Sequence, residues 1–121
     1  MLLVTSNREK QLLYLSYIGQ VRPGDLARHK AEVAALIAGL SPDFRVLVNL
    51  SELETMDLAC MTEIGCLMES IGRSGVGLIV RVVPDPAKDI GLNILSIFHY
   101  PQHQQIATCN NMVEAGKLLG I

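Results

Sequence analysis

The strongest indication of fold class lies in residues 44–57, Phe44-Arg-Val-Leu-Val-Asn-Leu-Ser-Glu-Leu-Glu-Thr-Met-Asp57. Residues 44–50 have a continuous apolar centre, Val46-Leu-Val48. Such a centre is typical of a parallel strand that is covered on both faces. A helix is predicted over residues 58–72, with Asp57 as its N-cap residue. Its apolar residues are expected to face mostly inward: Leu58, Met61, Ile64, Cys66, Leu67, Met68 and Ile71. A buried strand followed by a helix is the repeating unit of an α/β sheet.

The same alternation continues on both sides of this stretch. Further strands are predicted over residues 2–6, 11–19, 76–83 and 105–109. Further helices are predicted over residues 23–38, 86–98 and 111–120. The polar turn 7–10 joins the first two strands into an antiparallel hairpin. We therefore expect an α/β fold of order β-β-α-β-α-β-α-β-α, with a mixed, mostly parallel sheet flanked by helices, in a single domain spanning residues 1–121.

Composition narrows the class of protein. The chain has 121 residues, 50% of them hydrophobic and 18% charged, and this content excludes a disordered tail or a small disulfide scaffold. The chain has ten Lys and Arg residues against twelve Asp and Glu, and few aromatic residues. Binding of nucleic acid is disfavoured, because it needs excess positive charge for the phosphates and usually aromatic side chains for base stacking. Neither a signal peptide nor a membrane-spanning stretch is predicted, and three cysteines without CxxC spacing fit reduced thiols. We expect a cytoplasmic protein without membrane insertion.

The segment from Arg45 to Asp57 resembles strand 3 and the following turn of the STAS family, the anti-sigma-factor-antagonist domains also found at the tails of sulfate transporters. That family has a hydrophobic strand, Asp-Leu-Ser, a short spacer and then Asp-Ser before a helix. Here Asn49-Leu50-Ser51 and Asp57-Leu58 stand at those places. Leu58 thus takes the position of the phosphorylatable serine, and Cys60 stands where a glycine is usual. The resemblance implies a STAS-like fold, but a kinase-regulated antagonist cycle does not carry over.

Four carboxylates gather around the predicted strand–helix junction, those of Glu52, Glu54, Asp57 and Glu63. Three interpretations are open: a helix cap beside a solvated loop, a docking surface for a partner, or a site for Mg²⁺ or Ca²⁺. In STAS-like domains a partner docks at this edge, which favours the second interpretation. Phosphate on Ser51 or Thr55 would add negative charge beside acidic groups.

Other candidate sites carry weaker signals. Cys60 lies near the start of the predicted helix, where a helix N-terminus can depress a thiol pKa, but a buried structural thiol is the simpler interpretation. His99 and His103 have i,i+4 spacing, yet Pro101 breaks the helix that would align them for zinc. The glycines of residues 72–77 run from helix to strand, the reverse of a phosphate-binding loop. No catalytic, cofactor-binding or metal-binding residue is therefore assigned.

The prediction for function is a non-catalytic regulatory module that binds another protein without a cofactor. Its predicted docking residues are Glu54, Thr55, Asp57, Leu58, Met61 and Glu63. The partner implied by the resemblance is a regulatory protein, such as an anti-sigma-factor-like kinase or a scaffold. The apolar surplus of the predicted helix 86–98 allows three interpretations: a helix buried on two sides, a homodimer, or a hydrophobic pocket. The alternative function is therefore a carrier of a small apolar, lipid-like ligand.

Overall fold

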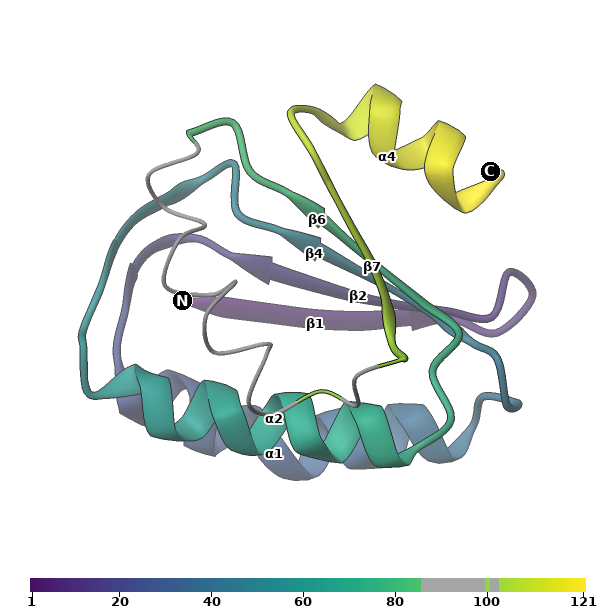
Figure 1. Cartoon of the computed structure of the whole chain (residues 1–121). Coiled ribbons are helices and arrows are strands. Elements are labelled where there is room, and N and C mark those ends of the chain that lie inside the picture. Colours follow the sequence, from purple (N-terminus) through teal and green to yellow (C-terminus); the bar gives the residue numbers. More distant parts are fainter. Residues whose placement is uncertain (86–99, 101–102) are drawn as a thin grey trace.

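The computed structural model describes residues 1–85, 100 and 103–121, and its central element is a five-stranded sheet (Figure 1). The strands, in their spatial order, are β1 (Leu2–Asn7), β2 (Leu12–Tyr17), β4 (Arg45–Asn49), β6 (Leu78–Val82) and β7 (Gln105–Cys109). The first pair is antiparallel and the other three pairs are parallel. The predicted hairpin and the predicted mixed, mostly parallel sheet are both confirmed.

Helices cover both faces of this sheet. The helices α1 (Pro23–Ala38) and α2 (Cys60–Arg73) lie along one face, and the short α4 (Met112–Leu119) lies on the other (Figure 1). In β4, the side chains of Val46 and Val48 belong to the larger core under α1 and α2, whereas Leu47 belongs to the smaller core under α4. This two-sided burial explains why the strand is almost continuously apolar.

The helix ends follow local side-chain chemistry. Pro23 occupies the first turn of α1, and the Asp25 carboxylate accepts a hydrogen bond from the backbone N–H of Arg22 at 3.0 Å. At the start of α4, Asn111 Oδ1 accepts a hydrogen bond from the backbone N–H of Glu114 at 2.9 Å. Gly120 ends that helix with a φ of 73°, which favours glycine. The predicted starts of both helices are confirmed.

Three expectations differ from the structure. A second, two-stranded parallel sheet joins β3 (Gly19–Val21) to β5 (Leu53–Met56), where a strand end and a loop were predicted. The two strands are too short for a periodic pattern to stand out. The second helix begins at Cys60 rather than at residue 58, because a hydrogen-bonded turn precedes it. Leu58 and Cys66 are exposed rather than inward-facing. The predicted helix 86–98 lies outside the described residues.

Candidate docking surface

Several hydrogen bonds hold the turn between β5 and α2. The Asp57 carboxylate accepts a hydrogen bond from the Ala59 N–H at 3.0 Å, and the Asp57 carbonyl accepts one from the Cys60 N–H at 2.9 Å. The Leu58 carbonyl then accepts a hydrogen bond from the Met61 N–H at 3.1 Å. Asp57 therefore caps the turn that leads into the helix, although Ala59 is the N-cap residue of α2 itself.

The small sheet ties this turn to the start of α1. The backbone N–H of Asp57 donates to the Val21 carbonyl at 3.1 Å, and the Cys60 thiol lies 3.5 Å from the same oxygen. Val21 is fully buried, and α1 begins two residues after it. The turn is thus anchored from both of its ends to one buried acceptor.

Leu58 stands out of this turn with 83% of its surface exposed. An exposed leucine is common, but this one lies in a hydrogen-bonded turn before α2 rather than on the inner face of the helix. The expectation that Leu58 faces the core was wrong for this reason. The turn presents one apolar side chain to solvent.

Two acidic residues adjoin Leu58 along the chain. One exposed basic residue, Arg22, directly follows Val21, whose carbonyl accepts the Asp57 N–H. Glu54, Thr55 and Asp57 are all exposed on β5 or on the turn, next to Leu58 along the chain. The segment from Val46 to Gly72 contains five acidic residues and no Lys, Arg or His. The structure therefore brings four of the six predicted docking residues into one exposed, acidic segment, which we call the docking turn: Glu54, Thr55, Asp57 and Leu58.

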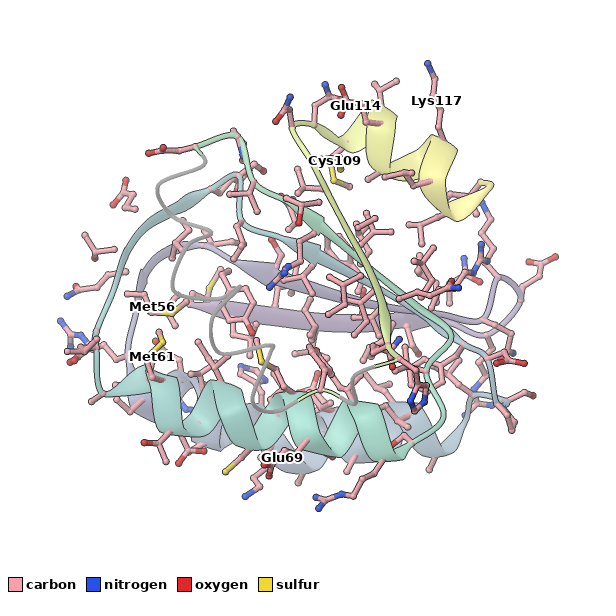
Figure 2. All side chains as sticks on the ribbon, in the orientation of Figure 1. Met56, Met61, Glu69, Cys109, Glu114 and Lys117 are labelled. Carbon is pink, nitrogen blue, oxygen red and sulfur yellow. The ribbon has the colours of Figure 1, made fainter. Side chains whose placement is uncertain are left out.

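The other two predicted docking residues lie elsewhere. Met61 is half-buried and packs against the main core, as does Met56. Figure 2 shows both thioethers at the end of the molecule where the chain enters α2. Glu63 is half-buried and lines a narrow cavity of about 20 Å³ between α1 and α2, together with Lys30 of α1. Neither side chain is as available to a partner as Leu58.

Cys60 is a buried structural thiol in this arrangement. Burial raises the pKa of the thiol above its usual value, and the Asp57 carboxylate raises it further. A raised pKa opposes formation of the nucleophilic thiolate. The chemistry favoured by this geometry is that of a thiol donating weakly to the Val21 carbonyl.

A buried polar cluster beneath α2 was not predicted from the sequence. Arg81 of β6 is only 4% exposed and, with Tyr17 and Tyr100, lines a cavity of about 30 Å³ in the main core. Burial raises the pKa of both tyrosines, while the Arg81 charge partly offsets this for Tyr100. The signal was present in the sequence, because Arg81 interrupts the apolar run 76–83. The cavity has room for about one water molecule.

An open groove of about 590 Å³ lies at the amino ends of the parallel strands. None of the residues that line it belongs to the docking turn. Its lining is mixed, with Asp43, Arg45 and His103 beside the glycines that precede β6. Both terminal nitrogens of Arg45 already donate to backbone carbonyls, those of Leu119 and Lys10. The Arg45 guanidinium is therefore already engaged by the backbone.

Two searches within the described residues were negative. Across residues 1–85, 100 and 103–121, no three His, Cys, Asp or Glu side chains are grouped to hold a metal ion. No helix in the same part of the chain is long and apolar enough to cross a membrane.

Comparisons with known proteins place this architecture. No family model and no curated protein matches the sequence. Among solved structures, an uncharacterized DUF3478-family protein with a SpoIIAA-like fold from Shewanella loihica PV-4 is similar, with a TM-score of 0.73 and 12% identity over 98% of this chain and 92% of that one.

Two anti-sigma factor antagonists are also similar in structure. Unphosphorylated SpoIIAA has a TM-score of 0.65 and 14% identity, over the whole of both chains. The antagonist from Mycobacterium paratuberculosis has a TM-score of 0.61 and 16% identity, over 100% of this chain and 94% of that one. The resemblance to STAS domains is confirmed at the level of structure: this chain has the SpoIIAA-like STAS fold.

Proposed function

We propose that the protein is a non-catalytic, cytoplasmic regulatory module that binds another protein through the docking turn. The observation that carries the proposal is Leu58, an apolar side chain that is 83% exposed on a hydrogen-bonded turn. Protein interfaces typically derive much of their energy from a few apolar anchors surrounded by polar residues. Leu58 with its acidic neighbours has this composition.

Charge defines the kind of partner. Glu54 and Asp57 adjoin the anchor along the chain, and the segment from Val46 to Gly72 contains five acidic residues and no Lys, Arg or His. The nearest basic residue along the paired strand β3 is the exposed Arg22. A partner with a shallow apolar pocket rimmed by Lys or Arg would complement this surface and would associate faster at low salt. Such a partner could be an anti-sigma-factor-like kinase or a scaffold, in line with the solved antagonists that share the fold.

The docking turn also separates this protein from a phosphorylation-controlled antagonist. Leucine at position 58 cannot accept phosphate, so binding through this position would not be switched off there by a kinase. We infer a docking surface that phosphate at position 58 does not control, and whose occupancy depends on the amount and the ionic environment of the partner.

The experiment uses site-specific photo-crosslinking in the source cells, with the crosslinker at position 58 or, as a control, at Val113. Val113 is 71% exposed on α4, on the other side of the sheet. We expect a defined protein adduct from position 58 that is absent from position 113. Identical adducts from the two positions would contradict the proposal.

A matched pair of double variants then tests the chemistry. The variant Glu54→Lys with Leu58→Glu changes the docking turn, and Glu9→Lys with Leu118→Glu makes the same changes at other exposed positions. Only the double variant Glu54→Lys with Leu58→Glu should lose the partner identified by crosslinking. Retention of that partner by the folded first variant would rule out this surface.

The alternative function, a carrier of a small apolar ligand, stays a prediction. The enclosed cavities along α2 measure about 30 and 20 Å³ in the described part of the chain. An acyl chain needs a much larger space, since pockets for small molecules commonly measure about 300–1,000 Å³. Native mass spectrometry of freshly purified protein checks this, because a carrier would retain a non-covalent mass that denaturation removes.

A further inference from the structure

The outer edge of β1 can be derived from its pairing with β2. Met1 and Ile18 exchange two hydrogen bonds, each 2.8 Å long, and so form a hydrogen-bonded pair. Such pairs alternate along an antiparallel ladder, and the register between the two strands is unbroken from Leu2 to Asn7. The N–H and C=O groups that point away from β2 therefore belong to Leu2, Val4 and Ser6.

This edge has no neighbouring strand among residues 1–85, 100 and 103–121, where β1 is the first strand of the sheet order. Natural proteins usually protect such an edge with a charged residue, a proline or a bulge. The sequence Leu-Leu-Val-Thr-Ser-Asn of β1 contains no charge and no proline, and its pairing with β2 contains no bulge. Leu3 is 45% exposed and Thr5 is also exposed on the face away from α1.

We propose that two copies of this chain associate by antiparallel pairing of their β1 edges about a two-fold axis at Val4. Leu2 then pairs with Ser6 of the other copy, Val4 pairs with Val4 of the other copy, and Ser6 pairs with Leu2 of the other copy. Each pair exchanges two N–H···O bonds, so every outward backbone group of the strand gains a partner. The two sheets become one continuous sheet.

The side chains support the same register. Leu3 of one copy lies opposite Thr5 of the other in the closer, non-hydrogen-bonded positions, where Cα atoms are about 4.5 Å apart. An aliphatic side chain next to a β-branched one is a favourable cross-strand pair. Pairing therefore covers Leu3, a large apolar side chain that is 45% exposed in the single copy.

A second copy is the occupant because the edge is complementary to itself. An isologous two-fold contact needs the same patch on both partners, and this patch carries no charge that would repel its own copy. One strand from each copy buries less than the roughly 1,200 Å² of a standard stable interface. The dimer should therefore be weak and depend on concentration.

The other edge of the sheet is a poorer candidate. The Val83 N–H donates to the Cys109 carbonyl at 2.8 Å, so Cys109 faces β6 and only Ile106 and Thr108 of β7 point outward. Two outward residues would supply fewer hydrogen bonds than the three of β1. The β1 interface also uses no residue of the docking turn, so it is independent of the proposed function.

The test compares two proline variants of the full chain by sedimentation equilibrium. Ser6→Pro removes an N–H that points away from β2, so the fold of one copy keeps all its own bonds. Thr108→Pro is the matched control, because it removes an outward N–H from the β7 edge. From about 5 to about 500 μM, the wild-type mass should rise from 13.2 kDa toward twice that value. Ser6→Pro should raise the dissociation constant at least about tenfold, since two hydrogen bonds are lost, and Thr108→Pro should leave it unchanged.

Amide hydrogen exchange supplies a readout at single residues. The Val4 amide should exchange more slowly as concentration rises, whereas the Thr5 amide, bonded within the hairpin, should not respond. If circular dichroism shows that Ser6→Pro is unfolded, Leu3→Lys replaces it, because that exposed side chain introduces a charge at the seam. A monomer throughout this range, or a dimer that survives the β1 variant, or one lost in Thr108→Pro, would overturn the proposal.

Discussion

Two leucines eight residues apart test whether the docking turn is free in solution. Leu58 is 83% exposed, so about a sixth of its surface is buried, and full burial of a leucine stabilises by about 1.5–3 kcal/mol. Leu58→Ala should therefore lower the free energy of unfolding by no more than about 0.5 kcal/mol. Leu50 is 1% exposed in the main core, and Leu50→Ala should cost about 2–5 kcal/mol through lost transfer energy and a residual cavity.

The assay is urea unfolding followed by far-ultraviolet circular dichroism. With a urea slope of about 1–3 kcal/mol/M, Leu50→Ala should move the midpoint by roughly 1 M or more, while Leu58→Ala should leave it nearly unchanged. A loss above about 1.5 kcal/mol for Leu58→Ala would mean that Leu58 is covered in the folded protein, contrary to its exposure in this structure. A small loss for Leu50→Ala would equally contradict the assignment of the core.

Three further predictions concern the cap of α4 and two kinds of titrating group. Asn111→Ala should lower stability by about 1 kcal/mol, measured by urea unfolding, because the Glu114 N–H loses its acceptor, whereas Asn111→Asp should retain it. The hydrogen bond from the Arg22 N–H lowers the pKa of Asp25. The ionised carboxylate therefore adds to the free energy of unfolding at pH values above the ordinary pKa of an aspartate, and this stabilisation is lost as the pH falls through the lowered pKa. Asp25→Asn should therefore flatten the acid limb of a plot of stability against pH, and an unchanged limb would contradict this. Burial raises the pKa of Tyr17 and Tyr100, so the stability that their neutral forms contribute is present below about pH 10 and is lost above it. In an alkaline titration of a Tyr14→Phe variant, which leaves only these two tyrosines, phenolate absorbance should appear only with unfolding, and its appearance in folded protein would disprove their burial.

The layered fold was predictable because each long element has a strong local pattern. The continuous apolar residues of β4 predict a strand buried on both faces, and Pro23 in the first turn of α1 predicts where that helix begins. The small sheet of β3 and β5 was not predictable, because three or four residues gain strand structure only by pairing across the intervening α1 and β4. Propensity over so short a stretch is too weak to show this.

The docking turn was predicted in part for a related reason. Glu54, Thr55 and Asp57 were predicted to lie at the strand–helix junction because they fall between the apolar strand and the helical pattern in the sequence. The exposure of Leu58 depends on backbone hydrogen bonds, which a helical pattern does not show. The helix period placed Leu58 on the inner face, and that placement holds only if the helix begins at residue 58. Because α2 begins two residues later, the leucine belongs to the turn. Glu63 was grouped with the turn by sequence distance, although it lines the cavity between α1 and α2.

The shared acceptor at Val21 has a consequence for the speed of recognition. One buried carbonyl receives the Asp57 N–H and lies 3.5 Å from the Cys60 thiol, so the turn cannot shift without disturbing the residues that lead into α1. A loop held in this way loses little conformational entropy when it is bound. Encounters need not wait for a rearrangement of this surface, and long-range attraction between opposite charges can then set the association rate. In the proposed function, such a surface would favour fast association, whereas the lifetime of each complex would depend on how well the partner's pocket fits one leucine.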